Sequence, residues 1–194
     1  MEISAVAVTR RDELIDSLLD IYLAEGFLSF SVADLAARLR CSKTTLYAIA
    51  PSKEQIVVAV VRAFFRQSAQ RIDAVTVGPG DPSERIGTYL HAISQELAPA
   101  SAAFFADLDS FAPAREIYRT NTQIAAQRVQ ELVAEGIDAG QIGALNASFV
   151  GVVAGQVMES IHRGEIEAAT SLDDSAAYKA LAELIVAGIA TPKG

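Results

Sequence analysis

Apolar residues recur every three or four positions along most of the chain, which is the spacing of one buried face of an α-helix. No stretch of strand length rich in Val, Ile and Thr alternates with polar residues between turn signals. The sequence therefore predicts an all-α protein. We expect about nine helices, which start at polar caps or Pro and stop near Gly or Pro. They cover residues 9–25, 32–39, 43–50, 53–74, 82–98, 101–110, 113–136, 144–163 and 175–190.

Helix lengths change at Pro51. Three short helices precede this residue, and six mostly longer ones follow it. The change predicts two domains, residues 1–52 and 53–194. The sequence contains no internal repeat and no low-complexity tract that would favour another division.

The second and third expected helices flank the tripeptide at residues 40–42, which is the spacing of a helix-turn-helix. In that motif the second helix enters the major groove of DNA, where short or flexible hydrogen-bonding side chains are needed. Lys43, Thr44 and Thr45 have this character, and Tyr47 carries a hydroxyl that can donate to a phosphate oxygen. The pattern favours a DNA-binding surface.

The same residues have an ordinary explanation as well. Ser31 with Asp34, and Ser52 with Gln55, are spaced as common helix caps, and short helices with two Thr occur in many all-helical proteins. Lys53, at the start of the fourth expected helix, is placed either to neutralise a phosphate or to lie on a solvated surface. Local chemistry alone leaves both interpretations open.

Residues 10 to about 65 resemble the N-terminal domain of the tetracycline-repressor (TetR) family of bacterial transcription regulators. A first amphipathic helix is followed by four matching stretches in the family order and spacing. They are Gly26-Phe27, Ser31-Val32-x-Asp34-Leu35-Ala36, Ser42-Lys43-Thr44-Thr45-Leu46-Tyr47 and Pro51-Ser52-Lys53-Glu54. The resemblance implies a homodimer with a three-helix DNA-binding domain and a helical domain for ligand binding and dimerisation. It also implies a repressor that leaves its operator DNA when a small effector binds.

The resemblance assigns DNA contacts to Ser31, to the recognition helix and to Lys53; the recognition-helix residues are Lys43, Thr44, Thr45 and Tyr47. Arg40, in the turn, is a further candidate DNA contact, because its cation can meet a phosphate. Two positions depart from the family, which usually has Gly where this chain has Arg40 and an aromatic residue where it has Ala50. These departures keep an alternative open: a helical small-molecule-binding or protein-interaction module with a degenerate DNA-binding head.

The last two expected helices are candidates for the dimer contact. Small residues recur every four positions in the first of them, and the second ends in LAELIVAGIA, which is apolar nearly all round. A monomer core would use the same residues, so that alternative stays open. The predicted interface residues are Ala147, Gly151, Gly155, Leu181, Leu184, Ile185 and Gly188.

Aromatic and polar residues on the longer helices are candidates for an effector pocket. Their number favours a hydrophobic or aromatic effector, although each residue also suits an ordinary core or surface. They are Phe64, Phe65, Tyr89, Phe104, Phe105, Phe111, Tyr118, Gln123, Phe149, Gln156 and Met158.

The amino-acid composition excludes several classes of function and of binding site. Of 194 residues 51% are hydrophobic, so the chain can bury a core, and the net charge of −8 argues against unspecific wrapping by nucleic acid. Residues 1–60 carry six Lys and Arg against eight Asp and Glu, so the DNA-binding half is not basic either. With Cys41 alone, an intrachain disulfide and a multi-thiolate metal site are excluded.

No enzyme chemistry is expected. His91 and His162 are the only histidines, and neither has an acidic partner at metal-ligand spacing. We therefore expect no enzyme activity, no cofactor and no metal. No apolar stretch is long enough to predict a membrane span, and we expect a cytoplasmic protein whose partners are operator DNA, an effector and a second copy of itself.

Overall fold

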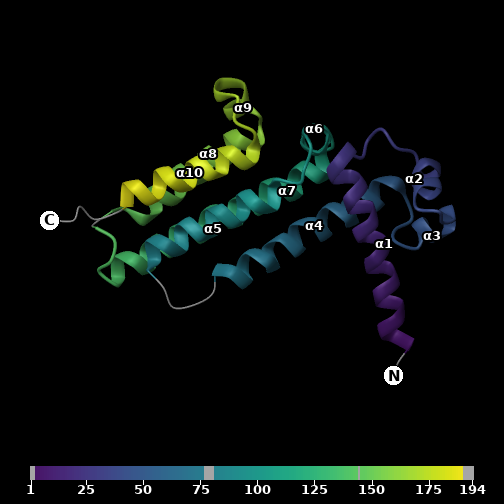
Figure 1. The fold of residues 1–194 in the computed structure, drawn as a ribbon, viewed down its shortest axis with the longest axis horizontal. Helices are drawn as coiled ribbons and strands as arrows, with labels where there is room; N and C mark the ends of the chain where they lie inside the picture. The colour runs from purple at the N-terminus through teal and green to yellow at the C-terminus, as the bar shows by residue number, and fades with distance from the viewer. Residues whose placement is uncertain (1–2, 77–80, 144, 190–194) are drawn as a thin grey trace. The chain divides into compact units, whose positions relative to one another are not determined.

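The structure, a computed structural model, describes residues 3–76, 81–143 and 145–189 (Figure 1). Within these ranges the chain is helical, with no strand, and no helix is long and apolar enough to cross a membrane. The helices are α1 (Ile3–Glu25), α2 (Val32–Arg38), α3 (Lys43–Tyr47), α4 (Lys53–Thr76), α5 (Pro82–Leu97), α6 (Ala102–Ser110), α7 (Ala112–Asp138), α8 (Ala147–His162), α9 (Glu165–Thr170) and α10 (Asp174–Ile189). The all-α prediction is confirmed.

Helix boundaries differ from the expected ones where a local signal was misread. The first helix begins at Ile3 rather than near Thr9, because residues 3–8 contain no Gly or Pro that would stop it. The eighth begins three residues later than expected, because the Asn146 side chain accepts a hydrogen bond from the Phe149 N–H (2.9 Å) and caps the helix.

A tenth helix was not expected. Gly164, with φ +70°, ends α8 as its sequence position indicated, but α9 begins directly after it. This six-residue helix, EIEAAT, buries no residue and has no apolar stripe, so the hydrophobic pattern gave no sign of it.

The described chain forms two compact units. Unit 1 contains residues 1–67 and 99–118, and unit 2 contains residues 68–98 and 119–194. Unit 1 is thus assembled from two separate stretches of chain. The domain boundary expected between residues 52 and 53 differs from the division into these compact units, and it stays a prediction.

Aromatic rings fill the core of unit 1. Tyr22 contacts Phe27 with ring centres 5.6 Å apart, and Phe27 contacts Phe104 at 6.0 Å. Phe104 in turn meets Phe64 at 5.7 Å. Aromatic pairs of this kind, of which the two with Phe104 are edge-to-face, contribute about 0.5–1.5 kcal/mol each beyond their buried area. They join α1, the loop after it, α4 and α6 into one core.

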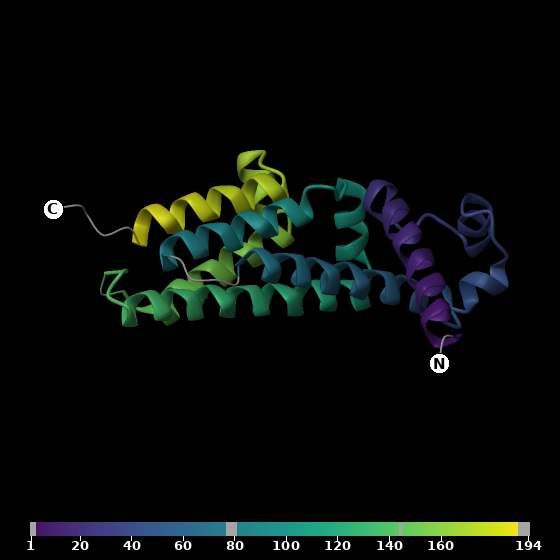
Figure 2. The ribbon, with the colours of Figure 1, turned by 60° about the horizontal axis from the view of Figure 1, so that its bottom comes forward.

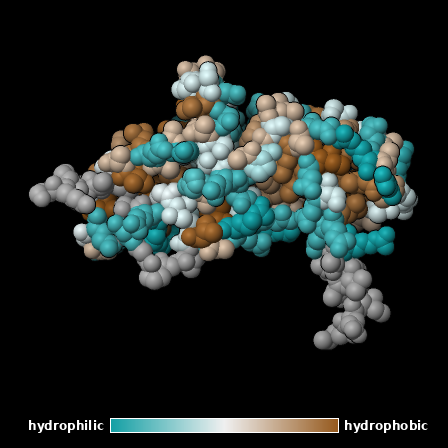
Figure 3. Space-filling model, in the orientation of Figure 1, coloured by the Kyte–Doolittle hydropathy of each residue, from teal (hydrophilic) through white to brown (hydrophobic). Residues whose placement is uncertain are grey.

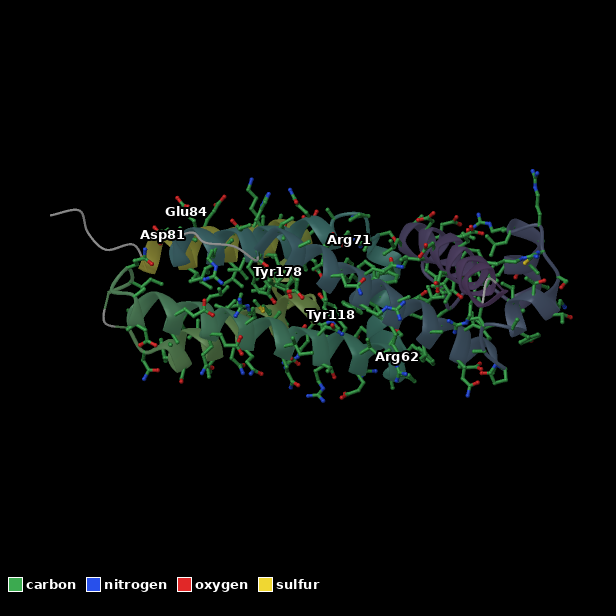
Figure 4. The ribbon with its side chains drawn as sticks, turned by 90° about the horizontal axis from the view of Figure 1, so that it is seen from below. Arg62, Arg71, Asp81, Glu84, Tyr118 and Tyr178 are labelled. Atoms are coloured by element: carbon green, nitrogen blue, oxygen red, sulfur yellow. The ribbon has the colours of Figure 1, made fainter. Side chains whose placement is uncertain are left out.

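Unit 2 is built around α10, which lies along α5 (Figure 2). Leu181 and Ile185 of α10 are buried, and the Ser94 hydroxyl of α5 donates to the Ser175 carbonyl at 2.8 Å. Tyr178 is also buried in this interior (Figure 4). Arg71 of α4 forms an ion pair with Glu96 of α5 at 2.6 Å, which fixes the end of α4 against α5.

Candidate functional site

Helix α2 begins with a complete capping box. The Asp34 N–H donates to the Ser31 hydroxyl oxygen at 3.2 Å, and the Ser31 N–H donates to the Asp34 carboxylate at 2.8 Å. The Ser31 hydroxyl, and after it the Ser31 backbone N–H, lowers the pKa of the Asp34 carboxyl below its ordinary value. The Ser31 side chain, a predicted DNA contact, therefore has a structural role in starting α2.

The turn after α2 has the hydrogen bonds of a Schellman motif. The Arg40 N–H donates to the Ala37 carbonyl (3.2 Å), and the Cys41 N–H donates to the Ala36 carbonyl (3.0 Å). This geometry requires a left-handed residue, and Arg40 has φ +50°. A residue with a Cβ costs about 1–2 kcal/mol in that conformation, so the exposed Arg40 side chain is kept at the expense of strain.

Helix α3 is fixed at one buried residue and two capping bonds. Leu46 is fully buried, and the Ser42 hydroxyl oxygen accepts from the Thr45 N–H at 3.0 Å. The Ser42 and Thr45 hydroxyls also share a hydrogen bond of 2.8 Å, so Thr45 is half-buried and already engaged. The solvent-facing side of α3 is left to other residues.

That side carries Lys43, Thr44 and Tyr47, all of them exposed. Tyr47 is 45% exposed although its ring is large and apolar. A cation, a hydroxyl and a phenol thus share the outer face of one short helix, next to α2 and to the exposed Arg40 (Figure 1). This composition suits a surface of phosphates and base edges.

The Lys53 side chain makes a contact within its own chain. Its ammonium donates to the Leu28 carbonyl at 2.8 Å, so the side chain reaches back to the loop between α1 and α2. An ammonium has three N–H groups, and this bond uses one of them. A phosphate contact by Lys53 stays a prediction, but the residue also holds the loop.

Two supports of this region were missed in the sequence. The Arg11 guanidinium donates to the Ile49 carbonyl at 3.4 Å, close to the end of α3, and Ile49 is buried beside Ala50 in the chain. Arg38 pairs with Glu25 at 2.6 Å and lies over the Phe30 ring. Long-range contacts from arginines to carbonyls and rings leave no periodic signal in a sequence.

The expected effector residues fall into three groups. Six of them pack ring against ring in unit 1 as part of its core, and two are buried in unit 2, where burial raises the pKa of the tyrosine phenol. Three are exposed on α7 and α8, and their role in an effector pocket stays a prediction. These groups are Phe64, Phe65, Phe104, Phe105, Phe111 and Tyr118; Tyr89 and Met158; and Gln123, Phe149 and Gln156.

The glycine ridge of α8 faces its own chain. A Cβ added at Gly151 would lie 2.7 Å from the Cβ of Gln130, and one at Gly155 would lie 3.2 Å from the Cβ of Ala126. Both glycines therefore serve the close approach of α8 to α7. Their contact with a second copy stays a prediction, because the small-residue spacing indicates a close helix contact without indicating which helix is the neighbour.

The other predicted interface residues are divided between core and surface. Leu181 and Ile185 are buried within unit 2, and Ala147 is half-buried. Leu184 is 69% exposed, and no atom lies within 4 Å of the place where a Cβ would extend from Gly188. Only the last two are available on the surface of α10.

A second apolar face was missed on α8, opposite its glycines. Phe149, Val152 and Val153 are 67%, 62% and 40% exposed, and their spacing puts them on one side of the helix. Leu184 adds to the exposed apolar surface on α10, which packs on α8 within unit 2. Brown and tan atoms interrupt the teal surface where α10 runs (Figure 3). Exposed apolar residues in such number favour a protein contact.

No group of three or more His, Cys, Asp or Glu residues that would hold a metal ion occurs within the described ranges. The exposed residues of α3 and of the turn before it form the candidate functional site. The exposed face of α8 is a separate candidate contact surface.

No protein-family model and no curated protein sequence matches this chain. Solved structures do. A TetR-family transcriptional regulator from Agrobacterium tumefaciens is 17% identical over 94% of this chain and 98% of its own, with a TM-score of 0.70. A TetR/AcrR-family regulator from Thermobifida fusca YX-ER1 is 23% identical over 94% and 100%, with a TM-score of 0.66. A transcriptional regulator from Saccharomonospora viridis, solved in complex with choline, is 14% identical over 90% and 94%, with a TM-score of 0.71.

The chain has the fold of the TetR-family transcriptional regulators. The similarity extends over nearly the whole length of both chains, including the C-terminal helices, for which the sequence contained no motif. At these identities the similarity establishes the fold alone.

Proposed function

We propose that this protein is a DNA-binding transcription regulator that acts as a homodimer. The observation that carries the proposal is α3, which is held from beneath by the buried Leu46 and presents Lys43, Thr44 and Tyr47 outward. A duplex major groove accepts one bare helix, and hydrogen-bonding side chains of this size reach its base edges and rails. Arg40 extends the cationic surface into the turn.

The exposed face of α8 supports the dimer. Burying Phe149, Val152 and Val153 against the same face of a second copy removes apolar surface from water at about 25 cal/mol per Å². A homodimer with two-fold symmetry has two copies of α3, and each would read one half-site of the same duplex.

A small effector would release the DNA. Such a ligand acts by binding better to a conformation in which the two reading helices no longer match successive half-sites. Support comes from the choline complex of the S. viridis protein, which has the same fold, and from the many aromatic residues of the helices after α3. The proposed role is that of a repressor with a hydrophobic or aromatic effector.

The test uses two lysines that are both exposed, Lys43 in α3 and Lys179 in α10. Binding to the DNA flanking the protein's own gene is measured as a function of salt concentration. We expect Lys43→Met to weaken binding and to reduce the salt slope by about two, because a homodimer loses one phosphate contact in each protomer. Lys179→Met should bind as the wild type does.

Equal affinity and slope in both lysine variants would contradict the assignment of α3 as the reading helix. Tyr47→Phe, which removes only a hydroxyl, adds a second measurement on the same face and should weaken binding by about 1 kcal/mol.

A second candidate function is a small-molecule-binding or interaction module that no longer binds DNA. Two observations favour it: the strained backbone at Arg40 and the engagement of Lys53 with Leu28. Ligand-dependent thermal stabilisation without any salt-sensitive DNA binding would support this candidate over the regulator.

A further inference from the structure

The loop between α1 and α2 is held at one residue from two other elements of unit 1. One carboxylate oxygen of Asp107, on α6, accepts from the Phe27 N–H at 2.5 Å and from the Leu28 N–H at 2.8 Å. The Lys53 ammonium, at the start of α4, donates to the Leu28 carbonyl at 2.8 Å. The backbone of Leu28 thus connects α6 with α4.

A glycine makes this close approach possible. Gly26 has φ +76°, and a Cβ there would lie 2.6 Å from the Asp107 carboxylate and 3.1 Å from the Ala103 carbonyl oxygen. One turn earlier in α1, the Leu23 carbonyl accepts from the Ser101 N–H, directly before α6, at 2.8 Å. The start and the middle of α6 are therefore both bonded to the end of α1 and its loop.

The position of the loop decides where α2 begins. Only two residues separate Leu28 from Ser31, the capping residue of α2, and the turn after α2 leads directly into α3. A carboxylate that accepts two backbone N–H groups forms charge-assisted bonds, which are about twice as strong as neutral ones. A displacement of α6 therefore displaces the loop and the cap of α2 with it.

We propose that Asp107 is a positioning residue, through which α6 sets the placement of α2 and α3. This inference rests on the proposed function, because the placement matters if α3 reads DNA. An effector that shifts α6 pulls the reading helix through two hydrogen bonds to the loop backbone. Lys53 closes the connection from the other side, and its two remaining N–H groups are free to meet a phosphate while Leu28 stays bonded.

Amide hydrogen exchange in the full-length protein is the first test. In the wild type, the Phe27 and Leu28 amides should exchange at least about tenfold more slowly than the neighbouring amides of Ser29 and Phe30, because only the former pair donates to Asp107. Equal exchange at all four amides overturns the inference.

Three variants carry the second test. Asp107→Ala should remove the protection of the Phe27 and Leu28 amides and raise exchange about tenfold through α2 and α3, without affecting α5 and α10. Asp107→Asn keeps an acceptor oxygen and should restore protection to within about threefold. Asp109→Ala, an exposed carboxylate on the same helix, should behave as the wild type does. Unchanged exchange in α2 and α3 with Asp107→Ala overturns the inference.

DNA affinity separates the inference from the function on which it rests. Asp107→Ala should weaken binding about tenfold, Asp107→Asn less than threefold, and Asp109→Ala not at all. If the wild type binds DNA and Asp107→Ala binds it equally tightly, the positioning role is overturned. The proposed regulator function then still stands. If the wild type binds no DNA, the proposed function fails. The hydrogen exchange of the α2 and α3 amides then still tests whether Asp107 positions these helices. Should Asp107→Ala not fold, Asp107→Ser, which is too short to reach both amides, replaces it with the same expected results.

Discussion

Gly26 and Arg40 show what one left-handed residue does at the end of a helix. Both stop a helix with a positive φ, and both lead into a loop or turn that positions the next helix. At Gly26 the missing side chain also makes room for the Asp107 carboxylate. At Arg40 nothing of that kind is required, so the position tolerates a side chain at a conformational cost.

The space at Gly26 leads to a prediction with a matched control. Gly26→Ala should destabilise the protein by about 2 kcal/mol or more, because the left-handed backbone costs about 1–2 kcal/mol and the Cβ adds a clash with Asp107. Gly140 has a similar φ of +69°, but no atom lies within 4 Å of the place of its Cβ. Gly140→Ala should therefore cost only about 1 kcal/mol. Urea unfolding measures both, and equal losses would show that the approach of α6 is not tight.

At the scale of the element, α8 has two faces with different tasks. Gly151, Ala154 and Met158 face the interior of unit 2, while Phe149 and Val152 face solvent. The small residues let α8 lie close to α7, and the large apolar ones remain without a partner in the single chain. The inward face of α8 thus combines glycines, which approach α7, with the larger Met158.

Gly151→Ala tests the seating of α8. Alanine favours a helix over glycine by about 1 kcal/mol, but the new Cβ would overlap the Cβ of Gln130 and force the helices apart at about 1–3 kcal/mol. We expect a net loss of stability in urea unfolding at fixed protein concentration. Gly155→Ala, whose Cβ meets Ala126 at 3.2 Å, should lose less. A stabilised Gly151→Ala protein would mean that α8 does not rest on α7 there.

Sequence reasoning succeeded where a local signal decides the structure. The Ser31 and Ser42 caps and the start of α5 at Pro82 all follow from a few neighbouring residues. It failed where the partner is distant in sequence. The glycines of α8 approach α7, a neighbour that their spacing does not indicate, and α9 has no apolar stripe by which to recognise it.

The candidate site could be found from sequence for the same reason, and its supports could not. Lys43, Thr44 and Tyr47 are adjacent in one motif, so their common exposure follows from the helix that contains them. The bonds of Lys53 to Leu28 and of Asp107 to the loop span 25 and 79 residues, and no periodicity reports such pairs.

At the scale of the whole molecule, we propose that the exposed face of α8 forms the dimer contact. Phe149→Glu should convert a dimer into a monomer of 20.5 kDa, because a carboxylate cannot be buried against apolar residues of a second copy without a partner. Analytical ultracentrifugation measures the mass. Val75→Glu alters a residue of similar exposure on α4, 61% against 67%, and should leave the dimer unchanged. A wild-type monomer, or a dimeric Phe149→Glu protein, would contradict this interface.

Because unit 1 contains residues 99–118 as well as residues 1–67, the N-terminal helices do not form a compact unit without α6. Severing the polypeptide after α4 would strip Phe104 and Asp107 away and leave Tyr22, Phe27 and Phe64 facing water. Chimaeras that graft this N-terminal segment onto a foreign sensor must therefore transplant α6 too. An exchange of the N-terminal helices between proteins during evolution would have to include α6 for the same reason.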